Sequence, residues 1–449
     1  MMERLTKKEC LWVSLMVFSL FFGAGNLIFP PFLGQTAGTQ LWPALGGFIV
    51  SAVGLPILGV VAVAKSGGLQ SLAKRVHPVF ALVFTLLVYL AIGPLLGIPR
   101  NGGLAFEMGI SPYLTSAWPE SGMALFMYSL VYFSVAFWLC LSPAKLSDRL
   151  GKLLTPLLLL LLGVIFVCSL VNPLGSFGQP VGGYVTDPFF KGFLEGYMTM
   201  DTIGALNFGM VIVMALKQKG VKGEKALITY TIYVGVFAGA LLAGIYVLLA
   251  YLGASGASLA AGASNGADTL TQVVLHLFGT PGIVLLGLVF TLACLSTSVG
   301  LITSCSQYFS SLTPRISYKG WVAILSSVSM LFANLGLDGI LAVSVPILSA
   351  VYPMAITLIV LALTDRWIHG RRMVYVGAMV CAGVVSVVDA CVQADLFSGR
   401  LAGWLSLLPL YEEGLGWTAP ALVGAASGLA LAVMVESRAV KRTQINQPS

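Results

Sequence analysis

A short polar stretch inside the first hydrophobic segment has residue types suited to binding small ions. Residues 23–26 read Gly-Ala-Gly-Asn, and two prolines, Pro30 and Pro31, close the run. In a helix interior, glycine costs about 1 kcal/mol and proline about 3 kcal/mol relative to alanine, so this order of residues predicts a broken helix. Within a bilayer, such a break is tolerated where the freed backbone N–H and C=O groups line a cavity or meet a ligand. The stretch is therefore either a kink packed through small residues or a discontinuous helix whose backbone binds an ion or a carboxylate.

A second polar stretch lies in the sixth hydrophobic segment, where Thr199, Asp201 and Thr202 stand between apolar residues. A carboxylate at membrane depth costs about 2.5–3.5 kcal/mol on the insertion scale, so Asp201 needs water, a cation or a polar partner. Four roles stay open for it: contact with an ammonium group, coordination of a cation, relay of a proton, or an ion pair with Arg100. Glu195 lies closer to the segment end and is the weaker candidate.

The composition is that of an integral membrane protein built from helices. Hydrophobic residues make up 58% of the 449 residues and charged residues 9%, with a mean hydropathy of +0.95. A soluble domain carries about 25% charged residues.

The seven cysteines include no C-x-x-C pair, which argues against a disulfide framework or a metal site. Residues 1–8 precede a long, interrupted segment without a cleavage site, which favours a cytoplasmic tail over a signal peptide. The net charge of +7 reflects topology and gives no indication of nucleic-acid binding.

About twelve hydrophobic segments are predicted to span the membrane, at roughly twenty residues each. The third and eighth exceed one membrane thickness, so they are tilted or include a re-entrant or loop helix. All Lys and Arg residues except Arg100, Lys191 and Arg400 fall in the tail and in alternate loops, which places both termini in the cytoplasm. The predicted segments are 10–35, 41–64, 78–108, 121–142, 150–171, 190–216, 226–252, 270–309, 320–336, 338–364, 373–394 and 417–436.

Interruptions in segments one and six, five apart, indicate a transporter built from inverted repeats, because a second copy of five spans starts on the opposite side of the membrane. An enzyme would need a catalytic cluster and a channel a repeated pore loop, and the sequence shows neither. Arg100 and Glu107 stand at i and i+7 on one helical face, which suits a gate and a structural salt bridge equally. A proton-coupled transporter or exchanger, with Asp201 or Glu195 carrying the proton, stays open beside coupling to another cation.

Five motifs along the chain resemble those of the bacterial branched-chain amino-acid:cation symporters. They are residues 23–31, 196–202, 292–297, 334–337 and 344–353, in this order. The resemblance covers essentially the whole chain and implies one polytopic domain, 1–449, of the leucine-transporter type. Its first inverted repeat would be 10–171, its second 190–364, and two further helices would occupy 373–436. One departure stands out, because the family commonly has Thr where Asn101 follows Pro99 and Arg100 here.

The resemblance also implies an activity, namely sodium-coupled import of Leu, Ile and Val. The lipid bilayer and the amino acid are then the expected partners, in a bacterial inner membrane, with no cofactor, no nucleic acid and no obligatory protein partner.

An amino-acid zwitterion needs donors for its carboxylate, acceptors for its ammonium group and an apolar pocket. Backbone N–H groups at the start of a half-helix bind anions, and freed carbonyls near residues 199–202 accept from an ammonium group. Neighbouring side chains, among them Phe22, Phe29 and Ile203, are candidates to cradle a branched side chain. The predicted substrate-binding residues are Ala24, Gly25, Asn26, Tyr197, Met198, Thr199, Asp201 and Thr202.

Sodium is a hard cation that prefers oxygen ligands. In the eighth segment, Ala293, Ser296 and Thr297 stand at i, i+3 and i+4, so one carbonyl and two hydroxyls can meet on one helical face. The alternative is that these hydroxyls bond to carbonyls of their own helix. The resemblance implies that the carbonyls of Ser19 and Phe22 complete a sodium site with five neutral ligands.

Overall fold

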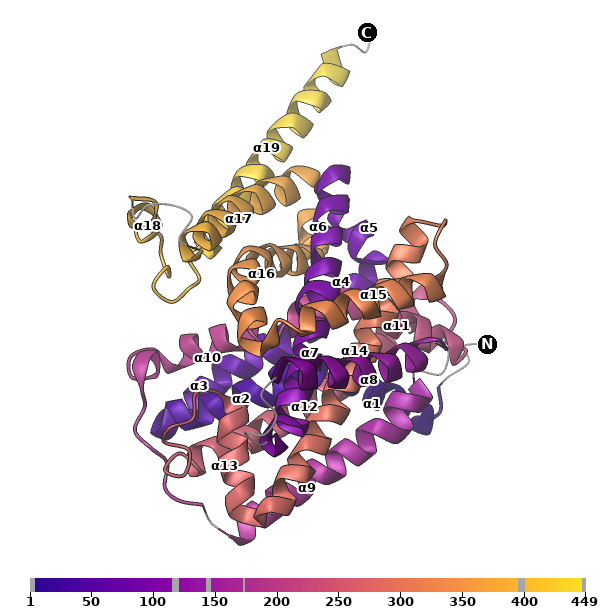
Figure 1. The fold of residues 1–449 in the computed structure, drawn as a ribbon. Helices are drawn as coiled ribbons and strands as arrows, with labels where there is room; N and C mark the ends of the chain where they lie inside the picture. The colour runs from indigo at the N-terminus through magenta and orange to yellow at the C-terminus, as the bar shows by residue number, and fades with distance from the viewer. Residues whose placement is uncertain (1–4, 115–120, 143–146, 173, 395–399, 446–449) are drawn as a thin grey trace. The chain divides into compact units, whose positions relative to one another are not determined.

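The computed structural model describes residues 5–114, 121–142, 147–172, 174–394 and 400–445, and the regular secondary structure in these ranges is helical (Figure 1). Helices suit lipid because each satisfies its own backbone hydrogen bonds. They are α1 Lys7–Phe21, α2 Ala24–Ala37, α3 Leu41–Ile49, α4 Leu55–Ser66, α5 Leu69–Ala73, α6 Pro78–Leu90, α7 Gly97–Gly109, α8 Ser121–Cys140, α9 Thr155–Val171, α10 Pro188–Tyr197, α11 Asp201–Gln218, α12 Glu224–Ser255, α13 Gly266–Phe278, α14 Thr280–Leu312, α15 Tyr318–Ala333, α16 Gly336–Ile368, α17 Arg372–Gln393, α18 Arg400–Leu405 and α19 Thr418–Ile445.

Two compact units make up the chain, each assembled from two stretches. The first comprises Met1–Ala64 and Val88–Ser344, and the second comprises Lys65–Leu87 and Val345–Ser449. Every residue assigned above to substrate or ion lies in the first unit.

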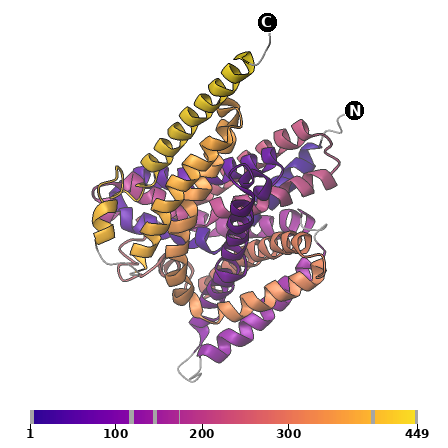
Figure 2. The same ribbon diagram turned by 90° about the horizontal axis from the view of Figure 1, so that it is seen from above.

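Within the second unit, α17 and α19 lie side by side in both views (Figures 1 and 2). Their backbones touch at glycines, because a methyl group on Gly377 would lie 2.2 Å from the carbonyl oxygen of Gly424. Such small-residue contacts are the usual way in which membrane helices approach closely. A separate polar cluster in this unit joins Arg75 to Asp365 across 2.9 Å, and the Tyr375 hydroxyl donates to the same carboxylate.

The first hydrophobic segment consists of two helices. α1 begins at a capping box in which the Thr6 hydroxyl accepts from the Glu9 N–H and the Glu9 carboxylate accepts from the Thr6 N–H. α1 ends at Phe21, the backbone is extended at Gly23, and α2 begins at Ala24. Pro30 and Pro31, which close the polar stretch in the sequence, lie inside α2, and the helix ends at Ala37, close to the end of the predicted segment 10–35.

The sixth hydrophobic segment is also interrupted. α10 ends at Tyr197, α11 begins at Asp201, and the two helices meet at an angle of 46°. Met200 precedes α11 in the left-handed conformation, with φ of 68°. A side chain other than glycine in this conformation costs roughly 1–2 kcal/mol, so the surrounding contacts must hold the turn in place.

Glycines bring the half-helices into backbone contact with their neighbours. A methyl group on Gly34 of α2 would lie 1.9 Å from the Ala250 carbonyl oxygen of α12, and one on Gly253 of α12 would lie 1.9 Å from that of Pro31. Similarly, a methyl group on Gly192 of α10 would lie 1.9 Å from the carbonyl oxygen of Ala44 in α3. α2 and α10 are thereby fixed closely against α12 and α3.

Nine helical stretches within the described residues are long and apolar enough to cross a membrane, or ten if α10 and α11 count as one span. The protein is therefore a multi-pass membrane protein. The prediction of about twelve segments differs from this number for two reasons. α1 has 15 residues and α15 has 16, too few to cross alone, and helix is nearly continuous from Ala24 to Ser66, which joins parts of two predicted segments.

The contact between α2 and α12 generates a prediction about stability. Gly253→Ala places a methyl group on the Pro31 carbonyl, so we expect a loss of about 1–3 kcal/mol, measured as a lower melting temperature in detergent. Gly244→Ala on the same helix is the matched control, because a methyl group there meets nothing within 4 Å and alanine is the better helix former. Equal melting temperatures for the two variants would contradict the proposed close contact.

Candidate functional site

A buried hydrogen-bond network links the two interrupted segments. The Asp201 side chain is 5% exposed, and its Oδ2 accepts from Asn26 Nδ2 at 2.5 Å and from the Tyr246 hydroxyl at 3.1 Å. Asn26 Nδ2 also donates to the Tyr246 hydroxyl. Asn26 Oδ1 in turn accepts from the Gly23 N–H at 3.1 Å, so one side chain joins the start of α2 to the start of α11. Asn26 and Tyr246 thus supply the polar partners that a carboxylate inside a membrane segment requires.

Two adjacent residues of α7 bind the freed backbone of both breaks. The Arg100 guanidinium donates through Nη1 to the Met198 carbonyl at 2.8 Å and through Nη2 to the Thr199 carbonyl at 3.1 Å. Asn101 Oδ1 accepts from the Ala24 N–H at 3.0 Å. Arg100 is 4% exposed and Asn101 3% exposed, so these contacts are made away from bulk water. Carbonyls near Thr199, expected above to receive an ammonium group, therefore receive a guanidinium here.

A small cavity lies between the breaks, with a volume of about 20 Å³. This is room for about one water molecule and too little for an amino acid. Its apolar walls come from Leu20, Phe21, Ile92, Phe208 and Leu301, a different set from the residues expected to cradle a branched side chain. The predicted site residues that line it are Ala24, Gly25, Asn26, Thr199, Asp201 and Thr297.

Three predicted substrate residues have other surroundings. The Tyr197 ring packs edge-on against Phe193, with ring centroids 5.3 Å apart, and Met198 meets Arg100 through its carbonyl. The Thr202 hydroxyl donates to the Ser51 carbonyl at 3.4 Å. Glu195, the weaker candidate carboxylate, forms an ion pair with Lys191 at 2.8 Å on the same helix.

The predicted ion ligands of α14 meet the end of α1. The hydroxyls of Ser296 and Thr297 both donate to the Ser19 carbonyl at 3.2 Å, and Ser296 also donates to the Ala293 carbonyl at 2.8 Å. The structure thus brings four of the five predicted ligand residues together. Phe22, the fifth, lies beside the break, where its ring stacks on Phe18 at 5.0 Å. The alternative bonding within the helix applies to Ser296 in part and was not found for Thr297.

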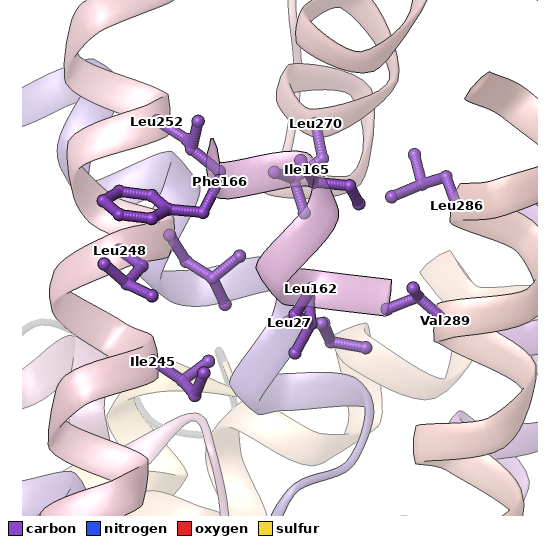
Figure 3. Close-up of a pocket in the computed structure, with 11 residues that line it drawn as sticks. Leu27, Leu162, Ile165, Phe166, Ile245, Leu248, Leu252, Leu270, Leu286 and Val289 are labelled. Carbon is purple, nitrogen blue, oxygen red and sulfur yellow. The ribbon is translucent and has the colours of Figure 1, made fainter. Parts of the chain in front are cut away.

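A separate apolar cavity lies beside α2, lined by side chains from α2, α9, α12, α13 and α14 (Figure 3). Leu27, Leu162 and Val289 are among them, and the volume is about 10 Å³. A space this small and without polar groups is a packing defect and does not recognise a ligand.

Arg100, Asn101 and Tyr246 contribute to these buried contacts and were not among the site residues predicted from the sequence. Asn101 was noticed only as a departure from a family pattern. Arg100 was considered as an ion-pair partner of Asp201 and, with Glu107, as part of a gate or a structural salt bridge. Tyr246 is one of four tyrosines in the long apolar helix α12, and nothing in the local sequence distinguishes it from the other three. A buried polar side chain in a spanning helix is the one general clue, because it must find a partner.

Comparison with solved structures places this fold among known transporters. Mhp1, a nucleobase-cation-symport-1 family transporter, aligns with 96% of this chain and 93% of its own, with a TM-score of 0.61 and 13% identity. MhsT, solved in complex with L-phenylalanine, aligns with 94% and 98%, with a TM-score of 0.55 and 17% identity. The fold is therefore the leucine-transporter type, and the two interrupted segments enclose its polar centre.

The particular family follows from sequence comparison. A family model described as branched-chain amino acid transport protein matches residues 6–435. Branched-chain amino acid permease BraB of Bacillus subtilis is 44% identical over 97% of this chain and 98% of its own length. The branched-chain amino acid transport system 2 carrier protein of Pseudomonas aeruginosa is 42% identical, over 97% and 98%. The chain belongs to the branched-chain amino acid transport protein family, so it is a transporter and not an enzyme.

The close approach at Gly25 generates a prediction about transport. A methyl group there would lie 2.9 Å from the Thr199 Cα and 2.9 Å from Arg100 Nη2, so Gly25→Ala forces the two breaks apart. We expect uptake of branched-chain amino acid to fall at least about tenfold, since a misplacement of this size carries a cost of that order or more. Gly46→Ala in α3, where a methyl group meets nothing within 4 Å, should keep wild-type uptake. Normal uptake by a well-expressed Gly25→Ala protein would remove this contact from the transport site.

Proposed function

We propose that the protein imports Leu, Ile and Val by sodium symport with alternating access across the bacterial inner membrane. The observation that carries the proposal is the convergence of the Ser296 and Thr297 hydroxyls on the Ser19 carbonyl, at the break in the first segment. Neutral oxygens suit a hard monovalent cation that must be released in each cycle. The proposed sodium ligands are Ser19, Phe22, Ala293, Ser296 and Thr297.

The amino acid is proposed to bind between the two breaks. Its carboxylate would meet the first-turn N–H groups of α2 at Ala24, Gly25 and Asn26, where helix geometry leaves donors without internal acceptors. Its ammonium group would lie near Asp201 and the Thr199 carbonyl. Tyr197, Met198 and Thr202 complete the proposed substrate set. Because the cavity holds about 20 Å³, binding requires a more open arrangement than the one described.

The proposed architecture has twelve membrane segments in one polytopic domain. Segments 10–171 and 190–364 would form the two inverted repeats, with two further helices at 373–436. The alternation of basic loops supports cytoplasmic termini. Apart from the coupling ion, no cofactor is proposed, and the proposed partners are the amino acid and the bilayer.

Coupling to protons is the second candidate, and one observation favours it. Asp201 is buried and hydrogen-bonded to the neutral groups of Asn26 and Tyr246. A carboxylate in such surroundings can gain and lose a proton as water enters and leaves, which is how membrane carboxylates act in proton relays.

Uptake into proteoliposomes under separate gradients distinguishes the two. We expect labelled leucine to accumulate when an inward sodium gradient is imposed at equal pH, and not under a proton gradient in sodium-free buffer. Liposomes without protein control for leakage. Accumulation driven by the proton gradient alone would reject sodium coupling.

Asp201→Asn tests the role of the carboxylate, since it keeps the side-chain shape and removes the titrating group. Under sodium coupling it weakens leucine binding and leaves the sodium requirement in place.

A second test concerns the ion site. Thr297→Val keeps the side-chain shape and removes one oxygen ligand, so the sodium concentration for half-maximal leucine uptake should rise about tenfold. Apparent leucine affinity at saturating sodium should change much less. Thr291→Val is the matched control on the same helix, because its hydroxyl faces Tyr128 at 3.4 Å and lies outside the proposed ligand set. Superimposable sodium titrations for wild type and Thr297→Val would contradict this ion site. The next candidate ligands for sodium would then be Asn26 and Thr199.

A further inference from the structure

Neighbouring residues of α7 contact the two backbone elements that are proposed to hold the two ends of the amino acid. Asn101 presents a carbonyl-type oxygen to the Ala24 N–H at 3.0 Å. Arg100 presents a cation to the carbonyls of Met198 and Thr199 at 2.8 and 3.1 Å. An acceptor oxygen and a cationic donor are also what a zwitterion offers, with its carboxylate and its ammonium group.

We propose that Arg100 and Asn101 form an internal occupant of the substrate site, which the amino acid displaces in order to bind. This inference rests on the proposed function. The Asn101 oxygen takes the place of a carboxylate oxygen at α2, and the Arg100 guanidinium takes the place of the ammonium group at the break between α10 and α11.

Physical chemistry gives a reason for such an occupant. The breaks leave backbone donors and acceptors at membrane depth, where an unpaired group costs free energy. The cavity between them holds about one water molecule, too few to hydrate both breaks. A site emptied of substrate therefore needs protein groups of matching polarity. The planar guanidinium fork suits this task, because it can span two successive carbonyls.

Displacement predicts a further class of ligand. A branched carboxylate that lacks the ammonium group can bind to the α2 N–H groups while Arg100 stays in place and supplies the missing cation. Leucine instead brings its own cation and meets repulsion from Arg100. 4-Methylpentanoate, which is leucine without its amino group, is therefore a ligand that depends on Arg100, whereas leucine competes with Arg100.

The experiment measures dissociation constants of leucine and 4-methylpentanoate for the purified full chain at saturating sodium, by competition against labelled leucine. In Arg100→Met we expect leucine to bind several-fold more tightly and 4-methylpentanoate about tenfold more weakly, so their ratio changes by more than about tenfold. Asn101→Leu is the matched control. It frees the Ala24 N–H for either carboxylate, so both ligands should bind more tightly by a similar factor, with their ratio unchanged.

Each result decides between displacement and a purely structural role. If Arg100 only holds the break together, Arg100→Met weakens both ligands in parallel, and the inference fails while the proposed function stands. Weaker binding of both ligands to Asn101→Leu would overturn the part assigned to Asn101. Arg100→Gln, which keeps an N–H donor for the carbonyls but removes the charge, serves if the methionine variant does not fold, and an unchanged ratio there would overturn the proposal. Absence of leucine binding to wild type would overturn the proposed function and this inference with it.

Discussion

The helices that bear the site are interrupted at membrane depth, so each freed backbone group has to find a partner inside the protein. Asn26 and Asn101 accept from the N–H groups of Gly23 and Ala24, and Arg100 donates to the carbonyls of Met198 and Thr199. These contacts allow the chain to keep two open helix ends in an apolar surrounding. The same open ends are what make binding of a small charged molecule feasible.

Charge is distributed unevenly across this centre. The break between α1 and α2 meets hydroxyls and carbonyls from α14, all of them neutral. The break between α10 and α11 meets one carboxylate and one guanidinium, both buried. A neutral oxygen cluster holds a cation reversibly, whereas a carboxylate at membrane depth discriminates strongly between charged and neutral groups. Under the proposed function, the first break serves the ion and the carboxylate of the amino acid, and the second serves its ammonium group.

Local chemistry explains which features could be predicted from the sequence. Glycines, prolines and an acid stand out in an apolar run because lipid penalises them, and helices of the structure end and begin near both polar stretches. The pattern at Ala293, Ser296 and Thr297 follows from helix geometry alone. The contacts of Arg100, Asn101 and Tyr246 are with residues 45 to 220 positions away, and no local pattern encodes those.

Contact of backbone with backbone has a mechanical consequence. At Gly34 and Gly253 the backbones of α2 and α12 meet directly, and at Gly192 the backbone of α10 meets that of α3, so no side chain separates the helices at these points. Contacts this close favour movement of each pair as one rigid body, so that a rotation of α2 would carry α12 with it. Bending would then be concentrated where the helices are interrupted. These points are Gly23, with extended backbone, between α1 and α2, and Met200, with left-handed backbone, between α10 and α11. Gly23 and Met200 would thus act as hinges about which the paired helices rotate as rigid bodies.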